Sequence, residues 1–255
     1  MTPLVATVVA NVLQPLIDVG NSVLTFFHDS VGLSWGMSII ALTVCTRALL
    51  IPLTYKSLKG MRALQALQPQ LKEIKEKYKN DQKRMQQEMM RFYQENKVNP
   101  FASCIPLLAQ LPVFITLFYV LKNELPADIG CTAGECGGEA SFLFINDLTA
   151  KAVGAELIVL LVLYVGTQLI SGLVMAVTAD KSQRMLMLIL PFIFVPFVIT
   201  FPAGLVLYWI TTNIWTIGQQ YTIQKLIPAP VVATPEEVAA AKPPPPPPKK
   251  KKRRR

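Results

Sequence analysis

The sequence lacks several features by which metal and nucleotide sites are recognised. It contains one histidine and four cysteines in 255 residues, too few nitrogen and sulfur ligands to suggest a metal site. It contains neither a phosphate-binding loop of the Gly-x-x-x-x-Gly-Lys-Ser/Thr type nor a Gly-x-Gly-x-x-Gly dinucleotide fingerprint. These absences argue against nucleotide hydrolysis and dinucleotide-dependent redox chemistry. We therefore expect no metal, no cofactor and no enzymatic activity.

Charged residues are scarce and apolar residues abundant, as in integral membrane proteins. Hydrophobic residues make up 52% of the chain and charged residues 16%, and the mean hydropathy is +0.40. Lys242 and the basic run 249–255 carry most of the net charge of +9. Residues 1–30 contain no lysine or arginine, so we do not expect a standard signal peptide there.

Five apolar segments approach or reach the roughly 20 helical residues needed to cross a bilayer. These segments are residues 35–54, 101–121, 157–179, 185–201 and 205–224. Lysine and arginine are concentrated in residues 56–99, in the turn 180–184 and in the C-terminal tail, whereas the loop 122–154 contains only Lys122 and Lys151. The positive-inside rule therefore predicts a multi-pass membrane protein with its N-terminus outside and its C-terminus in the cytoplasm.

The residues before the first span are half polar. Their polar side chains recur at steps of three and four and so share one helical face; they are Asn11, Gln14, Asp18, Asn21 and Thr25. We expect residues 1–30 to form an amphipathic helix in the membrane interface. A sixth span is the alternative.

The segment 56–99 contains eleven basic and five acidic residues, so we expect it in the cytoplasm. Its apolar residues follow a helical rhythm on both sides of a break at residues 79–81, which predicts a hairpin of two antiparallel amphipathic helices. Pro69 is expected to open the first helix. The stripe containing Met85, Met89 and Phe92 is either the seam between the two helices or an adaptable binding surface.

The remaining connections have distinct compositions. The loop 122–154 is acidic and contains Cys131 and Cys136; its expected position outside the cytoplasm makes them a candidate disulfide, although their spacing alone is weak support. Residues 225–255 are Pro-rich and basic, and we expect them to be disordered. The tail ends in seven basic residues that could bind ribosomal RNA or anionic lipid, or serve only to fix topology. These residues are Lys249, Lys250, Lys251, Lys252, Arg253, Arg254 and Arg255.

Arg47 lies inside the first span, although an arginine side chain stays charged in a protein. It is about 10 Å from the end of that span at the helical rise, so snorkelling could relieve part of its burial. No span contains an acidic residue that could pair with it. Neutral polar groups are available in several spans: Thr43, Thr46, Gln110, Gln168, Ser171, Thr211, Thr212, Asn213 and Gln219. Together these residues predict a hydrated, positively charged pocket in the inner half of the bilayer.

Four motifs resemble those of the YidC/Oxa/Alb family of membrane protein insertases. They are WGMSIIALTVCTRALLIPLTYK at 35–56, LQPQLKEIKEKYKND at 67–81, NPFASCIPLLAQLPVFITLFYVL at 99–121, and FPAGLVLYWITTN followed by GQQY between 201 and 221. The resemblance covers most of residues 31–224 and is specific because the motifs occur together. The short chain is similar to the Gram-positive or actinobacterial form of the family, which implies that it lies in the bacterial plasma membrane.

The resemblance implies an all-α membrane protein with five transmembrane helices around a hydrophilic groove. The groove would be open to cytoplasm and lipid, and lined by Arg47, Thr43, Gln110, Tyr208 and Trp209. Its parts would be residues 1–30, the first span within 31–55, the hairpin 56–99, the other spans within 100–224, and the tail. The loop 122–154 departs from the family pattern.

The same resemblance implies a function and a set of partners. The chain would insert nascent membrane proteins into the lipid bilayer, capture them first through the hairpin residues Met85, Met89 and Phe92, and contact the ribosome through its tail. The Sec translocon is a further candidate partner. Two alternatives are a small anion transporter or channel that uses Arg47, and a membrane-anchored ribosome receptor without insertion activity.

Overall fold

The structure is a computed structural model that describes residues 3–96, 98–99, 105–130, 137–176 and 181–226. Helices and turns account for nearly all of these residues. Pairing of extended backbone within them is limited to two isolated bridges, Phe142 with Ile145 and Lys151 with Pro202. The all-helical class expected from the sequence is therefore confirmed.

The described residues form two compact units, which are treated separately. The first contains the described residues up to Met61 and from Asn99 onward, and the second is Arg62–Val98. The division falls inside the helix α3, Ile51–Ala66.

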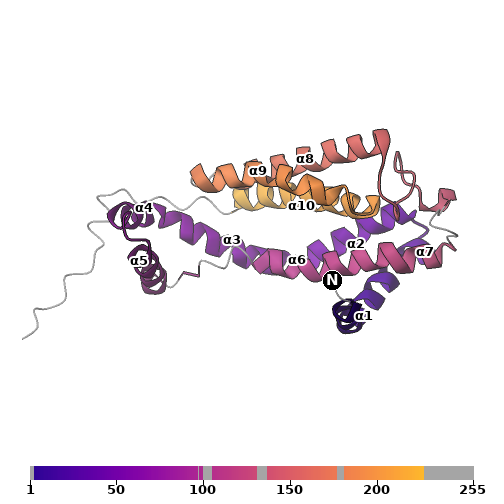
Figure 1. Cartoon of the computed structure of the whole chain (residues 1–255), viewed down its shortest axis with the longest axis horizontal. Coiled ribbons are helices and arrows are strands. Elements are labelled where there is room, and N and C mark those ends of the chain that lie inside the picture. Colours follow the sequence, from indigo (N-terminus) through magenta and orange to yellow (C-terminus); the bar gives the residue numbers. More distant parts are fainter. Residues whose placement is uncertain (1–2, 97, 100–104, 131–136, 177–180, 227–255) are drawn as a thin grey trace, which may run out of the picture. The chain divides into compact units, whose positions relative to one another are not determined.

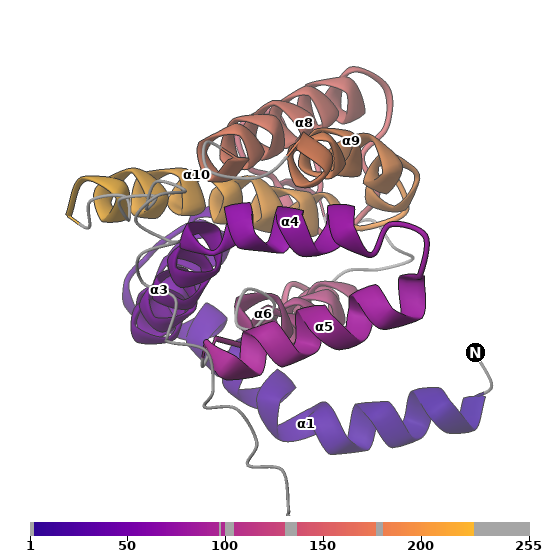
Figure 2. The same ribbon diagram turned by 90° about the vertical axis from the view of Figure 1, so that its left-hand side faces the viewer.

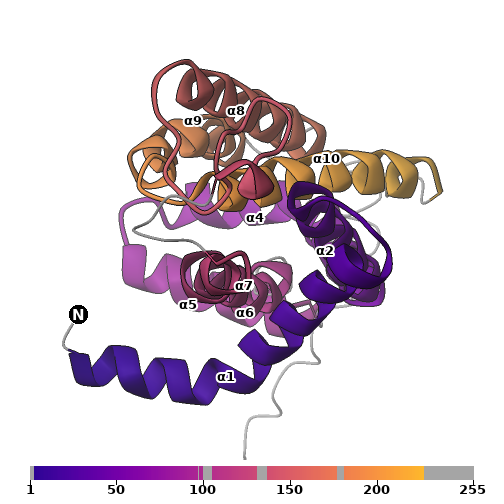
Figure 3. The same cartoon turned by 90° about the vertical axis from the view of Figure 1, so that its right-hand side faces the viewer.

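The first unit begins with a long helix that leads into the Arg47 helix. α1 (Pro3–Thr25) continues through a π-helical turn (Phe26–Ser30) and is followed by α2 (Trp35–Leu49). Ser34 caps α2, because its hydroxyl accepts a hydrogen bond from a first-turn backbone N–H of that helix. α1 contacts both α2 and α6, Ile105–Tyr119 (Figure 3).

The apolar segment predicted as a single span over residues 35–54 is bent. α2 ends at Leu49, α3 begins at Ile51, and the two helix axes differ by 54°. Pro52 explains the break because it has no N–H to donate to the carbonyl of Ala48, and because it disfavours helical geometry in the residue before it. Arg47 therefore lies in the last turn of α2, immediately before a change of direction.

Three helices complete the first unit. α8 (Gly154–Ala176), α9 (Lys181–Val198) and α10 (Ala203–Leu226) lie side by side, with α8 in contact with the other two (Figure 1). α6 extends through a π-helical turn (Val120–Glu124) into the short α7, Leu125–Asp128. α10 also contacts α2 and α6, so it joins the Arg47 helix to the rest of the unit.

Length and composition identify one described helix, Gly154–Val174, as able to cross a membrane, or two if the bent pair α2–α3 counts as one span. In α9 the apolar stretch Arg184–Val198 is shorter. α10 has 24 residues, but its threonine, asparagine and glutamine side chains lower its hydropathy. Part of the predicted second span, residues 101–104, lies outside the described chain.

Part of the buried core of the first unit lies where α10 begins. Leu121, Leu125, Leu148 and Leu205 are completely buried there. The loop before α8 is fastened to the start of α10, because Leu148 O accepts a hydrogen bond from the backbone N–H of Gly204 over 2.8 Å. Gly204 is required at this approach, since an added Cβ would lie 2.9 Å from the same oxygen. The buried leucines and this hydrogen bond hold the loop and the start of α10 together.

The second unit contains α4 (Gln68–Lys77) and α5 (Gln82–Glu95), which run in opposite directions and contact each other (Figure 2). Pro69 lies at the start of α4, as predicted from the sequence. Leu71 is the buried residue of α4, whereas Met85, Met89 and Phe92 on α5 are only half-buried.

Asp81 lies at the turn between these helices and its carboxylate accepts a hydrogen bond from Arg84 N over 3.0 Å. Replacing Asp81 with alanine is expected to destabilise the first turn of α5 by about 1 kcal/mol. Hydrogen exchange of the solubilised full-length protein should show faster exchange in the first turn of α5. Asp81→Asn, which keeps an acceptor oxygen, should exchange at nearly the native rate; equal exchange in native protein and alanine variant would show that the cap does not stabilise α5.

Candidate functional site

Arg47 is half-buried against the other helices of the first unit. Its Nε atom is buried and has no hydrogen-bond partner among the described residues. The two ion pairs among the described residues, Lys72 with Glu76 and Arg91 with Glu95, lie in the second unit and do not involve Arg47. Among the described residues, Arg47 is thus in no ion pair with a carboxylate.

Three predicted site residues from three helices come together. Tyr208 of α10 is 1% exposed, and its hydroxyl accepts a hydrogen bond from the side-chain amide of Gln110 on α6. The guanidinium of Arg47, on α2, is close enough to Tyr208 to interact with it electrostatically. The sequence separation between Gln110 and Tyr208 shows that only the tertiary fold creates this site.

Thr43 lies one turn before Arg47 and is 1% exposed. Its hydroxyl donates to the backbone carbonyl of Ile39 over 2.7 Å, which satisfies the hydroxyl proton within its own helix. Thr43 is thus a small, buried neighbour on the Arg47 face of α2.

Several buried polar atoms of the first unit have no protein partner among the described residues. They are Arg47 Nε, Gln110 Oε1, Thr116 Oγ1, Gln219 Nε2 and Asn21 Oδ1. All but the last are on α2, α6 and α10, the helices that carry the Arg47 site. A buried polar atom without a partner is costly, so each needs an explanation. Buried polar atoms without a protein partner are thus concentrated on the three helices that carry the Arg47 site.

Trp209 is next to Tyr208 in sequence, but its ring belongs to an aromatic cluster. It stacks on Phe114 with ring centroids 5.3 Å apart and lies 5.7 Å from Phe201 and 5.8 Å from Tyr164. Neighbouring residues on a helix differ in direction by about 100°, which explains why the two side chains separate. The cluster ties α10 to α6 and α8.

One polar contact between α10 and α8 was missed by sequence reasoning. Asn213 donates from Nδ2 to Thr167 Oγ1 over 3.2 Å. On α8, the sequence had identified Gln168 and Ser171 as the polar candidates. Thr167 lies four residues before Ser171, and that helical spacing could have identified it.

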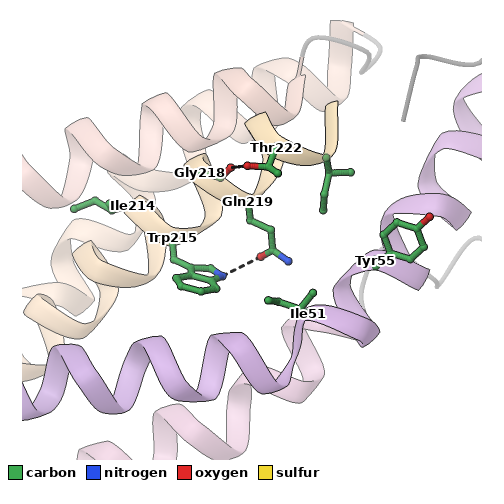
Figure 4. Close-up of a pocket in the computed structure, with 8 residues that line it drawn as sticks. Ile51, Tyr55, Ile214, Trp215, Gly218, Gln219 and Thr222 are labelled. Carbon is green, nitrogen blue, oxygen red and sulfur yellow. Dashed lines mark hydrogen bonds between the residues drawn. The ribbon is translucent and has the colours of Figure 1, made fainter. Parts of the chain in front are cut away.

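A cavity of about 630 Å³ lies further along α10, between that helix and the start of α3 (Figure 4). It is lined by Ile51, Tyr55, Ile214, Trp215, Gly218, Gln219, Thr222 and Ile223. Trp215 Nε1 donates to Gln219 Oε1 over 3.1 Å. The sequence identified Gln219 as a polar candidate but missed Tyr55 and Trp215. Trp215 follows Tyr208 by seven residues, about two helical turns, and Tyr55 follows Arg47 by eight. These spacings were the signals that could have identified them.

The other predicted site residues are elsewhere. Met85, Met89 and Phe92 belong to the second unit. Cys131, Cys136 and the basic run 249–255 lie outside the described residues. Within the described residues, three or more histidine, cysteine, aspartate or glutamate side chains nowhere group as they would to hold a metal ion.

Comparison with known proteins gives consistent matches. The family model described as "60Kd inner membrane protein" matches residues 26–230. A Streptomyces avermitilis protein named "Membrane protein insertase YidC" is 34% identical over 232 residues, covering 80% of this chain and 54% of the relative. A Cellvibrio japonicus protein of the same name is 39% identical over 204 residues, covering 80% of this chain and 35% of the relative.

A solved structure also matches. Its title is "Active YidC insertase crystal structure with the first transmembrane domain resolved", and it aligns with a TM-score of 0.63 and 25% identity. The match covers 83% of this chain and 46% of the solved chain. This chain thus spans about half, or less, of the length of these relatives.

Proposed function

We propose that this chain, which belongs to the 60Kd inner membrane protein family, moves nascent transmembrane segments from the cytoplasm into the lipid bilayer. The names of its relatives support this activity. The observation that carries it is the meeting of Arg47, Tyr208 and Gln110 from α2, α10 and α6, with no carboxylate in an ion pair with Arg47 among the described residues. Because no carboxylate pairs with Arg47 among the described residues, its positive charge can attract an acidic residue of a passing substrate.

The mechanism follows from the energetics of moving polar chain through hydrocarbon. A polar extracytoplasmic segment enters a hydrated groove, which shortens the apolar distance it must cross and lowers its desolvation cost. Arg47 attracts acidic residues of that segment. The apolar segment then moves sideways into lipid and gains burial free energy. The membrane potential assists the outward movement of negative charge by about 2.3 kcal/mol per charge per 100 mV.

The proposal includes an arrangement in the membrane. Five spans at residues 35–54, 101–121, 157–179, 185–201 and 205–224 surround the groove, with residues 1–30 in the interface. The N-terminus is outside and the C-terminus in the cytoplasm. The packing of the buried Leu121 and Leu148 supports a groove sealed at its outer end, and the polar residues of α10 support its role as a groove wall.

The proposal also includes the early steps of capture. The α4–α5 hairpin is cytoplasmic and receives the emerging segment on Met85, Met89 and Phe92, whose half-buried side chains suit an adaptable apolar surface. The tail binds the ribosome through the run 249–255. The alternatives, an anion transporter and a ribosome receptor without insertion activity, are not favoured by the names of the relatives. The Sec translocon stays a candidate partner.

Truncation after Ala241 is expected to reduce co-sedimentation of ribosomes with proteoliposomes, because it removes the basic run 249–255. The loss should be large at low salt and small at high salt, since phosphate contacts weaken steeply as salt rises. The full-length protein in the same lipids is the control. Equal ribosome binding by both chains at low salt would show that the run 249–255 does not bind the ribosome. It would then bind anionic lipid or only fix the topology.

Reconstitution tests the proposed function directly. Proteoliposomes containing the full chain should insert a ribosome-synthesised single-span protein, which is measured as protease protection of its translocated tail. Protein-free liposomes give the background. Insertion at the background rate would contradict the proposal, and chloride flux without any nascent chain would favour a channel.

A further inference from the structure

The loop that leads into α8 contains a tight turn that exposes two large apolar side chains. Phe142 and Ile145 exchange two backbone hydrogen bonds of 2.8 Å each, which leaves Leu143 and Phe144 at the tip of the turn. Leu143 is 85% exposed and Phe144 is 41% exposed, whereas Ile145 at the base is buried in the core of the first unit. The turn thus divides its apolar side chains between the core and the surface.

Leu143 has a backbone conformation that suits glycine better than leucine. Its φ is 54°, and it is the one non-glycine residue with a positive φ in the described part of the chain. Positive φ at only the first of two central residues is the pattern of a type II′ turn, where glycine usually occupies that position. A side chain this exposed gains little from packing within its own chain. The unfavourable backbone therefore points to a contact outside the chain.

The turn is held against the first turns of α2 and α8. Gly36, the second residue of α2, lies so close to the ring of Phe142 that an added Cβ would overlap the ring. Asn146, just after the turn, donates from N and Nδ2 to Glu156 Oε2 over 3.2 and 2.7 Å. Glu156 is the third residue of α8. The tip is therefore fixed near the level at which both helices begin.

That level is the boundary of the proposed membrane region. The stretch Gly154–Val174 of α8 is long and apolar enough to cross a membrane. A contact with the third residue of α8 places the turn within about one helical turn, or 5 Å, of the end of that helix. The polar region of each leaflet is about 5–8 Å thick. The tip therefore lies in the interface between water and hydrocarbon.

We propose that Leu143 and Phe144 insert into the lipid interface and anchor this loop to the bilayer surface. The inference rests on the proposed arrangement of the spans and does not depend on insertion activity. Large apolar side chains gain free energy on entering the interface and need no specific partner there. A protein partner would add polar contacts, but the carboxylates of Asp147 and Glu156 at the base of the turn already accept hydrogen bonds from their own loop. These observations favour lipid as the occupant.

An anchor at this place also bears on the depth of Arg47. Gly36 packs on the turn, and Arg47 follows it by eleven residues on α2, which is about 16 Å at the helical rise. The same loop is bonded to the start of α10 through Leu148 O and Gly204 N. Holding the tip in the interface therefore helps to set how far below the surface the Arg47 site lies.

The test replaces Phe144 with a fluorescent aromatic amino acid in the full-length protein. The protein is reconstituted into vesicles whose lipids carry bromine, a contact quencher, on the upper part of the acyl chains. The reporter at 144 should lose about half of its emission relative to unbrominated vesicles, since an interfacial side chain reaches that depth. The same reporter at Lys151, an exposed charged residue of the same loop, should lose much less.

A reporter at Val162 tests the arrangement of the spans separately. Val162 is 66% exposed on α8, so bromine placed deeper in the acyl chains should quench it. If position 162 is not quenched, the arrangement of the spans is wrong and the anchor with it. If position 162 is quenched but 144 is quenched no more than 151, the spans stand and the anchor is overturned. None of these measurements uses insertion, so a failed insertion assay would contradict the proposed function alone.

Substitutions of Leu143 give a second readout from the reporter at 144. Leu143→Gly removes the apolar side chain and suits the φ of 54°, so it should keep the fold and lower the quenching. Leu143→Asp should remove most of the quenching, because burying an unpaired charge is costly. Leu143→Met keeps the apolar bulk and should retain it. Equal quenching in all three variants, with unchanged thermal unfolding in detergent, would overturn the anchoring role of Leu143.

Discussion

Replacing Arg47 with alanine is expected to slow insertion of substrates with acidic translocated tails by about tenfold or more. Hydrogen bonds to charged groups contribute about 1.5–3 kcal/mol, and the variant removes the positive charge beside Tyr208. Arg47→Lys keeps that charge and should retain most of the rate. The measurement is the initial rate of protease protection in proteoliposomes.

Two controls separate this effect from a general defect. Arg184→Ala removes an exposed arginine from α9 and should insert at the native rate. Substrates with neutral tails should lose little with Arg47→Ala, because they have no charge to attract. If Arg47→Ala inserts acidic and neutral tails equally well, hydration of the groove matters more than the charge.

Replacing Leu121 with alanine should destabilise the first unit by about 2–5 kcal/mol, as do other buried leucine-to-alanine changes. Leu121 is completely buried in the π-helical turn after α6. Its methyl groups lie 3.1 Å from the position that a Cβ on Gly204 would take, where α10 begins. The change therefore leaves a cavity at the junction of α6 and α10.

The matched control is Leu108→Ala on α6, because Leu108 is 63% exposed. Thermal unfolding of the two variants and the native protein in one detergent measures the difference. A clear drop in the unfolding temperature is expected only for Leu121→Ala. Equal unfolding temperatures would show that the junction is not part of the cooperative core.

Local signals in the sequence predicted individual elements well. The helical class follows from apolar runs and their periodicity, and Pro69 was placed correctly at the start of α4. The break after Leu49 was not predicted, although Pro52 was visible near the end of the segment. Whether such a proline ends a helix, bends it or is accommodated depends on its neighbours, which periodicity does not reveal.

That the site is polar could be predicted from the sequence, but the identity of the residues around Arg47 was harder to predict. An arginine in an apolar run, with no acidic residue in any span, indicates a polar site from the sequence alone. Which neutral residues surround it depends on how α2, α6 and α10 pack. The packing brings Gln110 to Tyr208 and directs Trp209 into the aromatic cluster.

The sequence by itself determined that this chain is helical, membrane-bound and equipped with a permanent charge inside an apolar segment, since these properties depend on residue type and local spacing. Only the tertiary structure decided which side chains meet that charge, where the Arg47 helix turns, and where the apolar cavity between α3 and α10 lies. Those features depend on contacts between helices far apart in the chain. Such contacts are set by the fit of whole helix faces, and no single segment encodes that fit.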